Sequence, residues 1–398
     1  MSFDPARLLS PRTALADEGA IIRMAQKSRD LRAKGRDVVS LTVGEPDFDT
    51  PAFIQHAATK AMAEGFTHYS PVAGIPELRV GIAQKLETEN GIPMKPEGVV
   101  LANGAKQAVA NAILSLVDQG DEVILLAPYW VSYEVTARFA NGSPVVLKAG
   151  IEENYKVPAA RIAAALTPRS KLLVLNSPCN PTGAVWSKQE LEEIADVVKS
   201  HPQLMVLADE IYEYILFDGT MHSIAALPGM AERTVTINGF SKGFAMTGWR
   251  LGYSACVEPL AKAMMRMQST ISTGANQFVQ RAALAALAAP RTEVEEMRKR
   301  YQIRRDMVLK AFAGMNSVAL GPIPGTFYAF PDVSHLYGRK AGIDTAEQLC
   351  DWLLEEHGVA TVPGSAFGAP ESIRLSFAAG ETELEKALER IKAAFAKL

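Results

Sequence analysis

Lys242 and Asp209 are the side chains of this sequence whose types and settings point most directly to chemistry. Lys242 follows Ser241 shortly after a strand-like run at 234–237, and Asp209 closes another apolar run at 204–208. A lysine amine can bond to a carbonyl carbon, and a carboxylate can keep a nitrogen-containing ring protonated. Taken alone, Lys242 is better explained as an exposed loop lysine, and Asp209 as readily caps a helix.

Two further groups are suited to a phosphate. Arg250 lies eight residues after Lys242, at the start of the next strand-like run, and its planar guanidinium matches a phosphate dianion. A solvated surface charge is the alternative for Arg250. The segment Gly104-Ala105-Lys106 separates a strand-like run from a helical stretch, an arrangement that turns backbone N–H groups toward an anion. An amine, a carboxylate and a phosphate site together predict pyridoxal phosphate as cofactor.

These groups need a framework that brings strand ends together. Between about residues 52 and 290, helical stretches alternate with apolar runs of strand type at 98–102, 122–126, 144–147, 171–175, 204–208, 234–237 and 250–255. Continuous apolar strands separated by helices predict a mostly parallel α/β sheet with helices on both faces. Open α/β sheets bind ligands at the carboxyl ends of their strands, where Asp209, Tyr212 and Asn180-Pro181-Thr182-Gly183 should meet.

The rest of the chain predicts a second, smaller lobe. An amphipathic helix at 21–34 and a short strand at 38–43 come first, and a long charged helix at 293–316 and an amphipathic helix at 381–398 come last. We therefore divide the chain into an N-terminal segment that joins the small domain, a large cofactor-binding domain and a small C-terminal α+β domain, at 1–48, 49–290 and 291–398.

Composition narrows the class of protein. The 398 residues carry a net charge of −3 without a long basic run, which argues against nucleic acid and anionic membranes as partners. Residues 1–7 lack a secretory leader pattern, and no segment approaches the roughly 20 apolar residues of a membrane span, so we expect a cytoplasmic protein. Three cysteines and six histidines without metal-ligand spacing predict no metal site.

In combination, these residues resemble the class I aminotransferases of pyridoxal-phosphate fold type I, nearest to the bacterial aspartate/prephenate aminotransferase branch. The matching motifs extend over nearly the whole chain, at 44–48, 69–74, 127–133, 176–183, 209–212, 241–242, 246–253 and 374–378. The resemblance implies a large domain with a mostly parallel, helix-covered sheet, a smaller α+β domain, and a homodimer whose active sites are shared across the interface.

The resemblance also implies a role for each matching residue. Lys242 would carry the cofactor as a Schiff base and act as general base, and Asp209 would pair with its pyridine nitrogen. The other cofactor contacts would be Tyr212 and Asn180 on the phenolic oxygen, Trp130 stacked on the ring, and Gly104, Ala105, Lys106, Ser241, Arg250 and the partner subunit's Tyr69 on the phosphate. The substrate contacts would be Arg374 on the α-carboxylate, with Gly44, Trp130, Asn180 and Lys106.

The choice of substrate rests on fewer residues. In the aspartate branch a lysine at the position of Lys106 faces the distal carboxylate, and this chain keeps it. However, Ile21, Ile22 and Arg23 stand where that branch usually shows Ser-Ala-Thr, which removes a hydroxyl donor unless Arg23 replaces it. We expect an L-amino acid such as aspartate or glutamate, paired with a 2-oxo acid.

Three alternatives remain open at this point. The first is an aminotransferase for aromatic or neutral amino acids. The second is a pyridoxal-phosphate-dependent carbon–sulfur β-lyase, which would share Lys242, Asp209 and Arg374 and release pyruvate and ammonia without an amino acceptor. The third, a regulator with an aminotransferase-like domain, would need an additional DNA-binding domain. We disfavour it because the sequence begins almost at the predicted fold.

Overall fold

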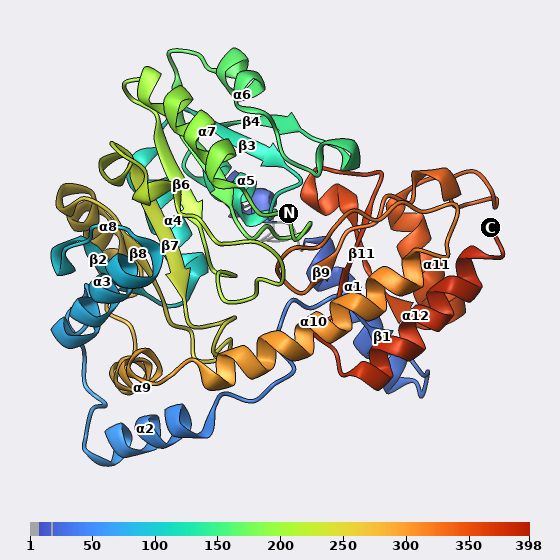
Figure 1. Ribbon diagram of the computed structural model, residues 1–398, viewed down its shortest axis with the longest axis horizontal. Helices are drawn as coiled ribbons and strands as arrows, with labels where there is room; N and C mark the ends of the chain where they lie inside the picture. The colour runs from blue at the N-terminus through green and yellow to red at the C-terminus, as the bar shows by residue number, and fades with distance from the viewer. Residues whose placement is uncertain (1–7, 17–18) are drawn as a thin grey trace, which may run out of the picture.

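The computed structural model describes residues 8–16 and 19–398 and is built around a seven-stranded sheet (Figure 1). Its strands, in the order β2-β8-β7-β6-β5-β3-β4, are β2 (Val99–Ala102), β8 (Gly252–Ala255), β7 (Thr234–Gly239), β6 (Met205–Asp209), β5 (Ser170–Asn176), β3 (Glu122–Ala127) and β4 (Ser143–Lys148). Among these seven strands, β8 runs in the opposite direction to the other six. The predicted mostly parallel sheet is therefore confirmed.

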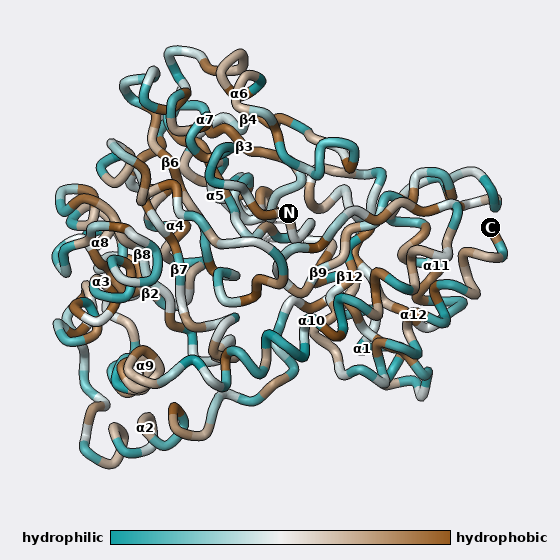
Figure 2. Tube along the Cα trace, in the orientation of Figure 1, coloured by the Kyte–Doolittle hydropathy of each residue, from teal (hydrophilic) through white to brown (hydrophobic). Residues whose placement is uncertain are grey.

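Helices cover both faces of this sheet. Along β5, Leu172 and Val174 pack into one apolar cluster with α4 (Ala105–Leu116), α5 (Ser132–Phe139) and α8 (Glu258–Ile271). Leu173 and Leu175 pack into another, with α6 (Ala159–Ala165) and α7 (Lys188–Ser200). Successive side chains of a strand point to opposite faces, so burial on both sides requires the continuous apolar runs of the sequence. Figure 2 shows this apolar character along β3 and β6.

A third cluster covers the β2 edge of the sheet. It is formed with α2 (Ala52–Ala63), α3 (Pro76–Asn90) and α9 (Gln277–Ala288).

Short 3-10 helices occur at Pro11–Ala16, Pro96–Gly98, Ile151–Glu153, Ile224–Ala226, Ala231–Arg233, Ser334–Leu336 and Gly364–Phe367.

The N- and C-terminal parts of the described chain pack together. Figure 1 shows the long helix α10 (Thr292–Phe312) reaching from the α9 region toward them. Their elements are α1 (Ala20–Ala33), β1 (Val39–Ser40), β9 (Tyr328–Ala329), α11 (Ala346–His357), β10 (Val359–Ala360), β11 (Val362–Pro363), β12 (Ile373–Ser376) and α12 (Glu381–Phe395). β1 pairs in parallel with β10, and β12 lies between β11 and β9 in an antiparallel sheet. The boundaries at 48/49 and 290/291 stay predictions.

Two sequence predictions differ from the structure. The strand expected at 250–255 begins only at Gly252, because Arg250 has a left-handed backbone with φ of 55°. The strand expected at 38–43 is reduced to the two residues of β1. Within the described residues, no helix is long and apolar enough to cross a membrane. Residues 1–7, where a leader was judged absent, lie outside the described ones.

Candidate active site

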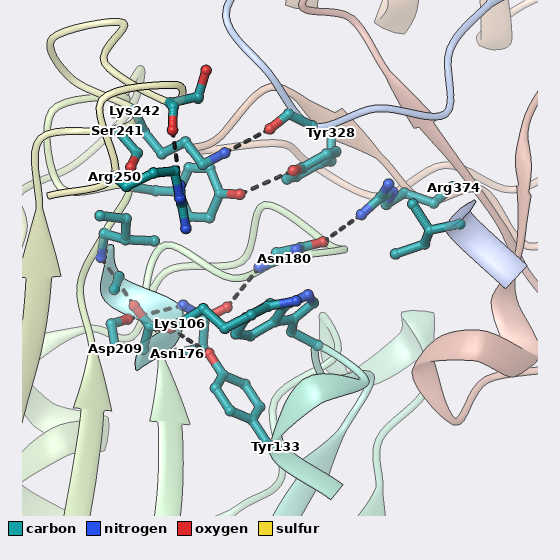
Figure 3. Close-up of a pocket in the computed structure, with 17 residues that line it drawn as sticks. Lys106, Tyr133, Asn176, Asn180, Asp209, Ser241, Lys242, Arg250, Tyr328 and Arg374 are labelled. Carbon is teal, nitrogen blue, oxygen red and sulfur yellow. Dashed lines mark hydrogen bonds between the residues drawn. The ribbon is translucent and has the colours of Figure 1, made fainter. Parts of the chain in front are cut away.

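A cavity of about 260 Å³ lies where the carboxyl ends of β5, β6 and β7 meet the C-terminal part of the chain (Figure 3). The predicted residues that line it are Gly44, Ala105, Lys106, Trp130, Asn180, Asp209, Tyr212, Ser241, Lys242, Arg250 and Arg374. Because β8 runs opposite to β7, its amino end lies at the same edge and brings Arg250 there. Residues from seven separate chain regions thus converge on one cavity.

Three predicted site residues lie elsewhere. Tyr69 does not line the cavity, and its side chain is 90% exposed. Gly104 lies just behind the lining, where an added Cβ would come within 2.5 Å of the Arg250 guanidinium. Arg23 is exposed and outside the lining, whereas Ile21, from the same helix, contributes to it.

Lys242 points its amine into the cavity. Its Nζ donates to the carbonyl oxygen of Gly44 at 2.6 Å. Burial, more than any other cause, lowers the pKa of this amine to about 8, while the nearby Glu45 carboxylate acts in the opposite direction. A considerable fraction of Lys242 is therefore neutral near pH 7 to 8, as a nucleophile or general base requires.

Asp209 is the last residue of β6 and is 4% exposed. Tyr133 Oη donates to its Oδ2 at 2.6 Å, and the backbone N–H of Ile211 donates to its Oδ1 at 3.2 Å (Figure 3). Turns rather than a helix follow Asp209, so the helix-capping explanation does not apply. Burial raises its pKa to about 6 despite these donors. A cationic group opposite Asp209 would offset that cost.

The opposite end of the cavity combines donors suited to an anion. The helix α4 begins directly after Gly104, whose φ of 87° is strained for any residue with a side chain. Because position 104 carries no side chain, the backbone N–H groups at the amino end of α4 stay uncovered beside the Arg250 guanidinium and the Ser241 hydroxyl. Helix N-terminal N–H groups, a guanidinium and a hydroxyl are the donor set that a phosphate dianion prefers.

Arg374 is a buried cation on β12, 1% exposed. Its Nη1 donates to Asn180 Oδ1 at 3.0 Å (Figure 3), and its Nη2 donates to the Thr42 carbonyl at 2.6 Å. Its Nε has no hydrogen-bond partner among the residues described, and no salt bridge to Arg374 occurs within 8–16 and 19–398. A buried charge without an anion is costly, so this guanidinium is suited to an anionic ligand.

Lys106 and Ile21 border the cavity with opposite character. The Lys106 Nζ lies 4.9 Å from the centre of the Trp130 ring, a cation–π arrangement. Partial burial of the Lys106 amine, followed by the charge of Arg250, lowers its pKa. Ile21 packs toward an apolar cluster that contains Phe367. One wall of the cavity is thus cationic and another is aliphatic.

The sequence prediction assigned no role to several lining residues, namely Tyr133, Asn176, Ile211, Thr247 and Tyr328. All but Tyr328 belong to the matching motifs, which were the available signal for them. Asn176 Nδ2 donates to the Asp209 carbonyl at 2.8 Å and so supports the same strand end. No local signal marked Tyr328, which reaches the site from β9.

Comparisons with known proteins place this geometry in context. A family model described as aminotransferase class I and II matches residues 36–391. A bifunctional aspartate aminotransferase and glutamate/aspartate-prephenate aminotransferase from Petunia hybrida is 44% identical over 97% of the chain and 82% of that protein. An aspartate/prephenate aminotransferase from Cereibacter sphaeroides is 41% identical over 97% and 98%. The solved aspartate aminotransferase of Thermus thermophilus with maleate superposes with a TM-score of 0.92 at 41% identity, over 97% of this chain and 99% of that one.

Proposed function

The chain belongs to the class I and II aminotransferases, and from that premise we propose that it moves an amino group between aspartate or glutamate and a 2-oxo acid, with pyridoxal 5′-phosphate at Lys242. The observation that carries the proposal is the buried guanidinium of Arg374, which forms no salt bridge among the described residues and lies in the same cavity as Lys242 and Asp209. The proposal assigns the cytoplasm as the place of reaction, where amino acids and 2-oxo acids are available.

The residues of the cavity fit this cofactor. Arg250, Ser241 and the amino end of α4 would hold the phosphate, Asp209 the pyridine nitrogen, and Tyr212 with Asn180 the phenolic oxygen. Trp130 would cover the ring. When bound, the cofactor supplies an electron-withdrawing ring that stabilises negative charge at the substrate Cα.

Lys242 performs the proton transfers. Its neutral amine takes the proton from the Cα of the amino donor, and in the second half-reaction it returns a proton to the Cα of the acceptor. The lowered pKa, about 8, keeps enough of the amine neutral for this work. Its hydrogen bond to the Gly44 carbonyl holds the amine beside the N-terminal segment that lines the cavity at Gly44.

Arg374 orients the substrate. Its guanidinium plane is held by Asn180 and by the Thr42 carbonyl, so its free edge can pair bidentately with an α-carboxylate. That pairing would hold the substrate with its Cα near Lys242 and would exclude water from the buried guanidinium. Both half-reactions use the same carboxylate contact, because donor and acceptor carry the same α-carboxylate.

The side-chain specificity depends on Lys106. Its amine, placed over Trp130, is the cation available for the distal carboxylate of aspartate or glutamate. Ile21 supports a second candidate, an aminotransferase for neutral or aromatic amino acids, because an aliphatic wall favours an apolar side chain. The two candidates differ in which of these walls contacts the substrate.

A donor panel tests the proposed specificity. We expect aspartate and glutamate to react fastest with 2-oxoglutarate or oxaloacetate, and Lys106→Ala to lower kcat/KM for these donors by about tenfold while sparing phenylalanine. Lys262→Ala, which changes an exposed lysine of α8, is the matched control. Equal or better wild-type turnover of alanine or aromatic amino acids would contradict the proposal. Release of pyruvate and ammonia without an acceptor would identify a β-lyase instead.

We further propose a homodimer in which Tyr69 of the partner subunit contacts the phosphate. The 90% exposure of Tyr69 and its absence from the cavity of its own chain support this arrangement. Tyr69→Phe is expected to weaken cofactor binding by about tenfold through loss of one hydrogen bond to a charged group. Cofactor dissociation constants from absorbance titration give the measurement.

Mixed dimers distinguish a site that contains Tyr69 of the partner subunit from an indirect effect of Tyr69→Phe on cofactor binding. A Tyr69→Phe subunit paired with a Lys242→Ala subunit contains one site with both native residues, so we expect it to regain wild-type phosphate affinity at that site. A mixture in which every site retains the Tyr69→Phe affinity would reject the shared arrangement. Mass measurement of the native protein shows whether the dimer forms at all.

A further inference from the structure

Tyr328 joins the cofactor side of the cavity to the substrate side. It lies on β9 and is 2% exposed. Its Oη is 2.9 Å from the Oη of Tyr212, and the Cζ of Arg374 lies 4.4 Å from the centre of its ring (Figure 3). One side chain therefore touches both the residue proposed to bind the cofactor's phenolic oxygen and the residue proposed to bind the substrate carboxylate.

The fold places Tyr328 rigidly. In the antiparallel pair of β9 and β12, Tyr328 lies opposite Ser376, two residues beyond Arg374 on the same strand. Residues i and i+2 of a strand share a face, so Tyr328 and Arg374 are diagonal neighbours across the pair. Any side chain at position 44 would collide with the Tyr328 hydroxyl, which explains the glycine there. The hydroxyl of Tyr328 thus has a defined position between Gly44 and Tyr212.

The groups around the two hydroxyls determine which tyrosine donates the shared hydrogen. Burial raises the pKa of both hydroxyls, and the Arg374 guanidinium opposes that rise at both. The Tyr328 hydroxyl and then the Asp209 carboxylate raise the pKa of Tyr212 further, whereas the hydrogen bond to Tyr212 lowers the pKa of Tyr328. Tyr328 is consequently the stronger acid of the pair, and the stronger acid donates. Tyr212 then accepts with its oxygen, which leaves its own hydrogen free to turn into the cavity.

We propose that Tyr328 is a positioning residue that donates its hydroxyl hydrogen to Tyr212 and thereby directs the Tyr212 hydrogen to the phenolic oxygen of the cofactor. The inference rests on the proposed function, because it needs that cofactor in the cavity. Hydrogen bonds in such a chain polarise one another, so Tyr212 becomes a stronger donor than it would be alone. The ring of Tyr328 separately supports the Arg374 guanidinium through a cation–π contact.

The test uses the pH midpoint of the visible absorbance change of the bound cofactor, which requires no turnover. Without a strong donor, the phenolic oxygen holds more negative charge and favours a proton on the neighbouring nitrogen, so the midpoint moves up. We expect Tyr328→Phe to raise it by about half a pH unit and Tyr212→Phe to raise it by more. The double variant should match Tyr212→Phe, since the Tyr328 hydroxyl acts on the cofactor only through the Tyr212 hydroxyl.

A second measurement separates the hydroxyl from the ring. We expect the dissociation constant for maleate, a dicarboxylate, to stay within about twofold in Tyr328→Phe and to rise about fivefold in Tyr328→Leu, which removes the cation–π contact. Tyr301→Phe is the matched control, because Tyr301 is equally buried and lies outside the cavity lining. Its midpoint and maleate affinity should equal those of the wild type. Thermal melting confirms that each variant is folded.

Different results would contradict the role of Tyr328 and the proposed function of the chain. An unchanged midpoint in Tyr328→Phe, a double-variant shift larger than that of Tyr212→Phe, or an equal shift in Tyr301→Phe would each overturn the role of Tyr328. Failure of the wild-type chain to develop any visible cofactor absorbance would instead overturn the proposed function, and the role of Tyr328 with it. A non-additive shift confined to the Tyr212 and Tyr328 variants supports the proposal.

Discussion

Replacing Lys242 with alanine is expected to lower kcat for aspartate by about 10⁴-fold, the largest effect of any single substitution in this chain. Lys242 is the amine that would bind the cofactor covalently and the group that moves the Cα proton, so both functions are lost together. Single-turnover reaction with aspartate, followed by absorbance, measures the loss directly. The folded chain should still bind the cofactor through Arg250 and the amino end of α4.

Two controls sharpen the Lys242 prediction. Lys262→Ala removes an exposed lysine that pairs with Glu258 on α8, and it should react like the wild type. A small added amine should restore part of the activity of Lys242→Ala, because a free amine can enter the cavity and take the proton. Retention of more than about a tenth of the wild-type rate in Lys242→Ala would show that another residue is the base.

Replacing Asp209 with asparagine is expected to lower the rate of the same half-reaction by about 10²- to 10³-fold, the second largest effect. Asparagine keeps the shape and can still accept from Tyr133, but it cannot stabilise a protonated ring nitrogen. Asp196→Asn, at an exposed position of α7, is the matched control. A rate within threefold of the wild type would remove Asp209 from the electron-withdrawing role.

Asp209 should also make the free energy of unfolding of the cofactor-free chain depend on pH. Its pKa is about 6 when folded, above the usual value for an unfolded aspartate, so the unfolded chain loses this proton first as pH rises. The stabilising contribution of the neutral acid is therefore present below about pH 4 and is lost between about pH 4 and 6, a change of about 3 kcal/mol.

Urea unfolding of the wild type and of Asp209→Asn measures this pH dependence as a difference between their free energies of unfolding. The free energy of unfolding of Asp209→Asn, relative to the wild type, should rise across the window from about pH 4 to 6. Glu210, whose pKa burial raises to about 8, titrates in both chains and largely cancels. A difference that is independent of pH would show that Asp209 is already ionised in the folded, cofactor-free chain.

Much of the cavity follows from local signals in the sequence. The apolar run before Asp209 predicts a strand whose carboxyl end carries the carboxylate, and the structure places Asp209 at the end of β6. The glycine at 104 predicts a bare helix start, and α4 begins at Ala105. Both inferences depend on features within a few residues, such as hydrophobic periodicity and the absence of a Cβ.

Other parts of the site have no local signal. Tyr133 reaches Asp209 across 76 positions, and Tyr328 reaches Tyr212 across 116. The prediction that Arg250 begins a strand was wrong, because Arg250 has a left-handed backbone, which an arginine rarely adopts and local propensity does not predict. The exposure of Tyr69 is visible only in the folded chain, and its proposed contact needs a second subunit.

The sequence by itself determined the alternation of strands and helices, the chemical types of the groups at strand ends, and through its motifs the aminotransferase family. These depend on local periodicity and on residue identity. Only the tertiary structure decided that Arg374 is buried without a carboxylate partner in the described part of the chain and that Tyr328 lies between it and Tyr212. Those contacts arise where β9 and β12 pack against the segment that follows β6, and packing between distant segments is not encoded in any single stretch of chain.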